Sequence, residues 1–107
     1  MAYEVLMTKD AARDLEELYD YISEHDAEEK AAYVLDAIAN VVESLTELPE
    51  RGSFPRELQP LGIKEFREAY FKPYRVIYRI QRNRVYILLI ADGRRDFQTL
   101  LAQRFLR

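Results

Sequence analysis

Four arginines in the second half of the chain have the side chains and the spacing to bind an anion. Arg75 and Arg79 are four residues apart in an alternating segment. On a β-strand they would project from one face, roughly 13 Å apart at about 3.3 Å per residue. Arg94 and Arg95 follow a long apolar run. Because guanidinium groups form bidentate contacts with phosphates and carboxylates, these residues predict a binding surface for phosphates or acidic side chains.

A structural explanation of the same arginines is also open. Acidic residues lie close to them in the sequence, namely Glu65, Glu68 and Asp96. The arginines can form ion pairs with these residues, or their charge can protect the edge of a sheet from pairing with another chain. The sequence does not decide between a binding surface and internal pairing.

Other catalytic chemistry has little support. The one histidine, His25, is next to Asp26 in a loop, and we interpret it as solvated loop polarity. The chain has no cysteine, no phosphate-binding loop, no GxSxG motif and no metal-ligand spacing. We therefore expect no catalytic residue, no metal and no cofactor.

The charges are divided unevenly along the 107 residues. Residues 1–50 hold 14 acidic and 3 basic side chains, whereas residues 51–107 hold 5 acidic and 13 basic ones, and the net charge is −3. This asymmetry indicates either a polyanionic or acidic partner for the basic half, or mutual complementation within one domain. The length predicts a single domain, 1–107, and no apolar run approaches a membrane span. We expect a soluble, cytoplasmic protein that makes no membrane contact.

Three segments predict the sheet that positions the arginines. Tyr74, Val76, Tyr78 and Ile80 alternate with polar or charged residues, which is typical of a strand with one buried face. The run 85–91 is apolar on both faces and is predicted to be the central strand, joined to the first by a short hairpin. Residues 66–71 predict a third strand that turns at Lys72-Pro73. In this arrangement Arg75 and Arg79 lie on the open face of the sheet.

The first half predicts one strand and a helical hairpin. Residues 3–7 alternate and are predicted to be an edge strand. Thr8 is a candidate N-cap for a helix to about Glu24, and Asp26 with Glu29 predicts a capping box for a second helix that ends at Pro49. Residues 49–62 form a long loop. After the sheet, Asp96 is predicted to cap a final helix.

These elements predict an α+β fold in which an N-terminal helical hairpin packs on one face of a small, mostly antiparallel sheet. The expected order is β-α-α-β-β-β, followed by a short C-terminal helix. At the very end, Arg104 and Phe105 form a charged and aromatic mixture typical of a contact surface. The alternative is that Phe105 packs a last helical turn onto the sheet.

The chain resembles the RelE/ParE superfamily of toxins from type II toxin–antitoxin systems. The resemblance covers nearly the whole chain and is carried by AARDLEELYDYI, ELPERGSFPREL, GIKEFREAYFKPYRVIYRI and VYILLIADGRRD. The tail DGRRDFQTLLAQRFLR is most similar to the ParE branch, which usually has a histidine or similar residue where this chain has Asp92. That branch implies a plasmid-stabilisation toxin that inhibits DNA gyrase and causes growth inhibition. A cognate ParD-like antitoxin would silence it, and DNA contact would occur only through this antitoxin.

The ribonuclease branch, which cleaves messenger RNA on the ribosome, is the rival. It resembles this chain at Arg75 and Arg95, but two of its basic positions correspond here to Phe66 and Glu68, and its C-terminal aromatic residue falls at Leu101. Cleavage by a 2′-hydroxyl group needs a proton acceptor, and arginine is a poor base. A sequence pI near 5.2 also suits a ribosomal RNA partner badly. A non-toxic relative that only binds a partner is the third possibility.

Target or antitoxin contacts are expected at the charged positions and in the tail, namely at Arg75, Arg79, Arg94, Arg95, Arg104 and Phe105. An amphipathic antitoxin segment is expected to fold beside the helical hairpin, with its acidic residues near Arg75, Arg79 or Arg94.

Overall fold

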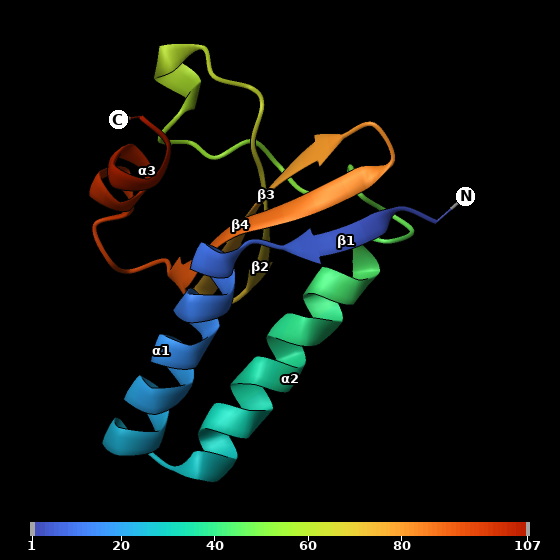
Figure 1. Ribbon diagram of the computed structural model, residues 1–107. Helices are drawn as coiled ribbons and strands as arrows, with labels where there is room; N and C mark the ends of the chain where they lie inside the picture. The colour runs from blue at the N-terminus through green and yellow to red at the C-terminus, as the bar shows by residue number, and fades with distance from the viewer. Residues whose placement is uncertain (1, 107) are drawn as a thin grey trace.

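The computed structural model describes residues 2–106 and has the predicted α+β architecture (Figure 1). The elements follow in the order β1 (Glu4–Met7), α1 (Lys9–His25), α2 (Glu28–Ser44), a 3₁₀ turn (Gln59–Leu61), β2 (Arg67–Phe71), β3 (Tyr74–Gln81), β4 (Arg84–Asp92) and α3 (Phe97–Phe105). None of the described helices is long and apolar enough to cross a membrane.

The sheet has the strand order β1-β4-β3-β2. β2, β3 and β4 form an antiparallel meander, and β1 pairs in parallel with β4, from Glu4 beside Arg84 to Met7 beside Ile87. The predictions of a central β4 and an edge β1 are confirmed. Arg82 begins the tight β3–β4 turn at a φ of 58°, in the left-handed region that such hairpin turns require.

The helix boundaries are set by local hydrogen bonds. The Thr8 hydroxyl accepts from the Ala11 N–H at 3.1 Å and donates to the Ile87 carbonyl at 3.1 Å, so the predicted cap also fastens α1 to the central strand. The predicted capping box is wrong. Asp26 instead closes α1 by donating its N–H to the Ile22 carbonyl, and Ala27 precedes α2 without a side-chain cap. The connection is too short for Asp26 to do both.

The second helix also ends earlier than predicted, at Ser44 instead of at Pro49. The Ser44 hydroxyl donates to the Val41 carbonyl at 2.6 Å, and the Thr46 hydroxyl donates to the Glu43 carbonyl at 2.8 Å. These side chains take acceptors that the next helical turn would use. The chain then turns, and the Tyr78 hydroxyl donates to the Pro49 carbonyl at 2.7 Å. The start of the long loop is thus held against β3.

The main core lies between the α1–α2 hairpin and one face of the sheet. The predicted alternation in β3 is confirmed, because Tyr74, Val76 and Tyr78 are buried there and Ile80 packs beside them. The helices contribute small and branched residues to the same core, namely Ala11, Ile22, Ala31, Val34 and Ile38. Burial of these apolar side chains is the main favourable contribution to the fold.

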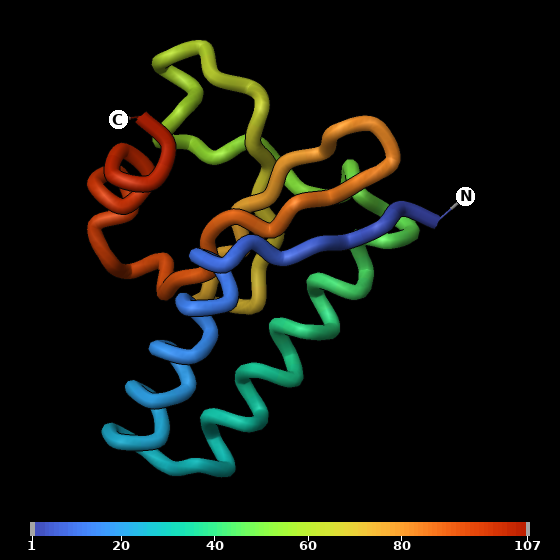
Figure 2. Tube along the Cα trace, in the orientation of Figure 1, coloured from blue at the N-terminus to red at the C-terminus, as the bar shows by residue number. Residues whose placement is uncertain are grey.

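The other face of the sheet is covered, which corrects the prediction of an open face. The long loop and α3 lie across it, on the side away from the helical hairpin (Figures 1 and 2). They form a second core with the sheet, made of Leu58, Phe66, Ile77, Leu89, Ala91, Phe97 and Leu101. A bulge in β4 places one residue of that strand in this second core. Ile77 pairs with Leu89 but Tyr78 pairs with Ile87, so Leu88 has no partner and Leu89 turns toward the second core.

Candidate functional site

Arg75 lies inside a buried ionic cluster on the second face of the sheet. Only 4% of the residue is exposed, and its Nε atom donates to Oε1 of Glu68 at 2.6 Å. Its two terminal nitrogens donate to the carboxylate of Glu57, each at 2.8 Å. The guanidinium carbon lies 3.9 Å from the centre of the Phe97 ring, which is a cation–π contact. Arg75 of β3 therefore links the long loop and α3 to β2 and β3 of the sheet.

The charges of this cluster compensate one another. Burial lowers the pKa of Arg75, but the hydrogen bonds to Glu57 and Glu68 outweigh it and raise that pKa above its usual value. The hydrogen bonds from Arg75 likewise hold the pKa of Glu57 below its usual value. The expectation that Arg75 projects from an open face is wrong. The alternative of pairing with Glu68 is correct, and Glu57 is an additional partner.

Arg79 lies further along β3, where the covering layer ends. Its side chain is partly exposed and is opposite Tyr86 of β4. Within residues 2–106 it forms no ion pair, in contrast to Arg75. Arg79 is therefore accessible from solvent, and Arg75 is not.

Arg94 and Arg95 stand at the carboxyl end of β4, as predicted. The Arg94 side chain is 76% exposed and turns back onto Asp92, to which Nη2 donates at 2.6 Å. The hydrogen bond from Arg94 holds the pKa of Asp92 below its usual value, against the effect of burial. The side chain of Arg95 is exposed and forms no hydrogen bond or ion pair within the described chain. These two residues provide the most accessible cations of the predicted set.

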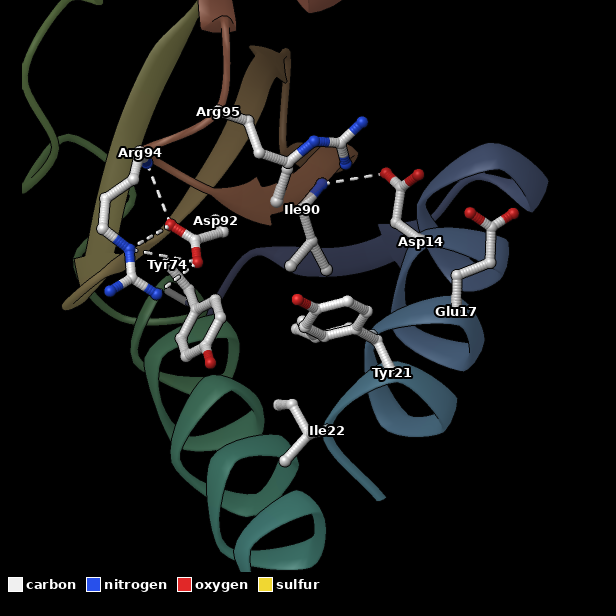
Figure 3. A pocket seen from close by; sticks show the side chains of 11 residues that line it. Asp14, Glu17, Tyr21, Ile22, Tyr74, Ile90, Asp92, Arg94 and Arg95 are labelled. Atoms are coloured by element: carbon white, nitrogen blue, oxygen red, sulfur yellow. Dashed lines mark hydrogen bonds and ion pairs between the residues drawn. The ribbon is translucent and has the colours of Figure 1, made fainter. Parts of the chain in front are cut away.

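A cleft of about 390 Å³ opens beside these arginines, between α1 and the end of β4 (Figure 3). Leu18, Ile22 and Ile90 give it an apolar floor, and the side chains of Tyr21 and Tyr74 lie on opposite sides of it. Burial raises the pKa of Tyr74, so its hydroxyl stays protonated at neutral pH. The cleft combines an apolar interior with a charged rim.

Arg104 and Phe105 are used in packing. Arg104 holds the Asp14 carboxylate with hydrogen bonds of 3.0 and 3.2 Å and donates to the Leu88 carbonyl at 2.7 Å. Asp14 also accepts from the Ile90 N–H at 2.9 Å. These side chains satisfy β4 backbone groups beyond the point where β1 ends. Phe105 stacks on Phe66, with 4.7 Å between the ring centres. The packing alternative for Phe105 therefore describes its position.

Residues 5–97 match the family model of the ParE toxin of the type II toxin–antitoxin system parDE. The chain belongs to this family. It is 29% identical over 100 residues to Toxin ParE3 of Caulobacter vibrioides, and the match covers 94% of this chain and 96% of ParE3.

Solved structures agree with this assignment. A chain of the chromosomal ParDE system from P. aeruginosa is 22% identical with a TM-score of 0.70, covering 85% of this chain and 96% of that one. A chain of the RelBE2 toxin–antitoxin complex from Mycobacterium tuberculosis is 26% identical with a TM-score of 0.62, covering 86% and 99%. An E. coli RelE mutant in the free state is 14% identical with a TM-score of 0.62 over both full chains. The first and third likenesses concern the fold alone. The resemblance to the RelE/ParE superfamily is confirmed, and this protein is a type II toxin.

This ParE-family toxin has a second hollow that sequence reasoning did not locate. A groove of about 550 Å³ runs between the helical hairpin and β1, with Val5 and Met7 on one side and Leu35, Ile38 and Val42 of α2 on the other. Next to it, β1 pairs only with β4, so its outer edge has no strand partner in the described chain.

The predicted site residues of this ParE-family toxin do not form one cluster. Arg94 and Arg95 share the cleft beside α1, Arg79 lies on the opposite face, and Arg75 and Arg104 are held by internal carboxylates. Sequence reasoning missed Tyr21, whose helical position gave no sign that it stands opposite Tyr74. His25 stacks on Tyr21 at 4.1 Å at the exposed end of α1. Within residues 2–106, no three His, Cys, Asp or Glu side chains are grouped to hold a metal.

Proposed function

We propose that this ParE-family toxin inhibits DNA gyrase and does not cleave RNA. The resemblance of the tail to the ParE branch supports this target. The observation that carries the proposal is the state of Arg75, the arginine that the ribonuclease branch shares. It is buried and neutralised by Glu57 and Glu68. A guanidinium group held in this way is not available to a scissile phosphate.

The surroundings of Arg75 also lack what RNA cleavage requires. Two positions that are basic in the ribonuclease branch are Phe66, which is buried against Phe105, and Glu68, which binds Arg75. Leu101, which stands where that branch has its C-terminal aromatic residue, is buried in the second core. Attack by a 2′-hydroxyl group needs a proton acceptor and free positive charge near the phosphate. The carboxylates here are occupied by the arginine, which favours inhibition of a protein target.

The gyrase-contacting surface is proposed to centre on Arg94 and Arg95, and Arg79, on the opposite face of the sheet, is proposed as a separate contact. Arg94 and Arg95 are exposed at the end of β4 beside the apolar cleft. Arginine beside an apolar pocket is typical of the residues that dominate protein–protein binding energy. Arg104 and Phe105 support this surface indirectly, because they anchor α3 behind it.

We propose that a ParD-like antitoxin neutralises the toxin at the groove beside β1. The ParDE and RelBE2 structures are named as toxin–antitoxin systems, which supports a partner of this kind. The apolar floor suits one face of an amphipathic helix, and the free β1 edge can accept an added strand. Asp36 and Glu43 on the rim favour basic residues in the part of the antitoxin that lies in the groove. Acidic antitoxin residues are proposed to reach Arg79 or Arg94.

The place of action follows from the target. DNA gyrase acts on chromosomal and plasmid DNA, so the toxin is proposed to act in the cytoplasm and to support plasmid stabilisation together with its antitoxin. In this scheme the antitoxin alone binds duplex DNA.

Induction in cells tests the proposal. The toxin is expressed alone and together with the protein encoded beside it, and growth, plasmid supercoiling and messenger integrity are followed. We expect growth arrest with relaxed plasmid and intact messengers, and recovery when the neighbour is present. Messenger cleavage with normal supercoiling would indicate the ribonuclease branch, and normal growth in both cultures would indicate a non-toxic relative.

A further inference from the structure

The cleft between α1 and the end of β4 has the features of a small-molecule site. Its volume of about 390 Å³ lies within the range of about 300 to 1,000 Å³ that is usual for ligand pockets. An apolar floor and a few charged groups at the rim are also typical of such pockets. The proposed protein contacts do not account for the aromatic walls.

The aromatic wall can stack a planar ring. Tyr21 is 61% exposed, although it is a large aromatic side chain. Its ring stacks on His25 with 4.1 Å between centres, so one face is covered by the helix to which it belongs. In Figure 3 the ring lies over the cleft, across from Tyr74 and next to Ile90. A flat ligand that enters between these residues would bury apolar surface and stack on tyrosine.

The charged rim divides into neutralised groups and free groups. Asp14 is paired with Arg104, and Asp92 is paired with Arg94. Arg95 and Glu17 form no ion pair or side-chain hydrogen bond within residues 2–106. Arg94 binds Asp92 through Nε and Nη2, which leaves its Nη1 without a partner in the described chain. The cleft therefore offers free cationic donors and one free carboxylate.

We propose that this cleft binds a nucleotide. The base stacks on the ring of Tyr21, next to Ile90. The Glu17 carboxylate accepts hydrogen bonds from N–H groups on the edge of the base. The phosphate binds the Arg95 guanidinium, which extends toward the α1 side of the cleft (Figure 3), through charge-assisted hydrogen bonds. Guanine fits best, because its two neighbouring N–H groups match the two oxygens of one carboxylate.

A third hollow lies next to the cleft and extends the basic surface. It has a volume of about 290 Å³ and is lined by Arg56, Lys72 and Tyr70, and Arg94 lines both hollows. Lys72 forms no ion pair within residues 2–106. The nucleotide can be a free molecule or one unit of a single strand, and in a strand the next phosphate would lie near Lys72.

Calorimetric titration of the full chain tests the proposal with GMP, IMP and guanosine as probes. We expect GMP to bind at least tenfold more tightly than guanosine, and more tightly than IMP, which lacks one of the two N–H groups. Arg95→Ala should reduce GMP affinity about tenfold and leave guanosine affinity unchanged. Arg82→Ala is the control, because it removes an exposed arginine at the distant β3–β4 turn. Circular dichroism checks the fold of each variant.

Three results would overturn the proposal. These are the absence of saturable binding, equal affinity for GMP and guanosine, and a GMP affinity that Arg95→Ala leaves unchanged.

Titration with a guanosine dinucleotide distinguishes a free nucleotide from one unit of a single strand. Affinity about tenfold above that of GMP, lost in Lys72→Ala, identifies a strand. Affinity equal to that of GMP identifies a free nucleotide, and both results support the site.

Discussion

Replacing Arg75 by methionine should destabilise the toxin strongly at neutral pH. Methionine fills a similar volume, so the main change is the loss of the positive charge between Glu57 and Glu68. Both carboxylates lie within 2.8 Å of the guanidinium nitrogens, and their side chains are 13% and 3% exposed. Removing one partner of a buried ionic cluster costs about 3 to 5 kcal/mol. This is a large part of the roughly 5 to 15 kcal/mol typical of a domain.

The effect of pH has opposite signs in the native chain and in this variant. In the native chain, hydrogen bonds from Arg75 hold the pKa of Glu57 below its ordinary value near 4.5. The stability that Glu57 contributes is therefore present above that ordinary value, and it is lost as the pH falls through the lowered pKa. Without Arg75, burial is left as the main influence on Glu57 and raises the pKa of its carboxyl group. The variant should therefore become more stable as the pH falls from 7 toward 5.

Urea denaturation followed by circular dichroism at pH 7 and pH 5 measures both effects. A triple variant, Arg75→Met with Glu57→Gln and Glu68→Met, is the matched control, because it leaves no charge unpaired. It should recover most of the lost stability and retain growth inhibition. A loss below about 1 kcal/mol in the single variant, with native pH dependence, would refute the account of a compensated cluster. Arg75 would then be free to act on a target.

Three further predictions concern the supports of the cleft. Arg104→Ala should lower the free energy of unfolding by about 2 kcal/mol, because it leaves the Leu88 carbonyl and the Asp14 carboxylate without their charged donor. Urea denaturation measures this, and a decrease below about 0.5 kcal/mol would contradict it. Gly93→Ala should lower the free energy of unfolding by about 1 to 3 kcal/mol, because the added Cβ would lie 2.7 Å from Cδ of the fixed Arg75 side chain. An unchanged thermal midpoint would contradict this, because it would show that Arg75 can move to make room. A double variant, Arg94→Ala with Arg95→Ala, should stay folded and bind antitoxin with an affinity within about tenfold of that of the native toxin. It should no longer inhibit growth, and full toxicity would exclude these arginines as target contacts.

The strands and helices could be predicted because local patterns determine them. The alternation around Tyr78 and the apolar run of β4 specify the sheet, and Thr8 and Asp96 cap the helices that they were predicted to cap. The structure of residues 2–106 confirms these elements, and the predicted boundaries differ from the observed ones by a few residues. The capping box at Asp26 failed because the residue was needed to end the preceding helix.

The second face of the sheet could not be predicted, since it depends on contacts distant in sequence. The loop has no periodicity, so nothing indicated that Leu58 would be buried or that Glu57 would reach Arg75. The bulge at Leu88 reverses the facing of Leu89, which a simple alternation cannot show. As a result, the internal role of Arg75 remained one of two interpretations.

Supercoiling by purified DNA gyrase tests the central claim most directly. Relaxed plasmid is incubated with gyrase, ATP and increasing amounts of toxin, and a parallel sample contains translating ribosomes and messenger RNA. We predict that supercoiling is lost with increasing dose, that antitoxin restores it, and that the messenger stays intact. Cleavage of the messenger with supercoiling unaffected would contradict the account and assign this toxin to the ribonuclease branch.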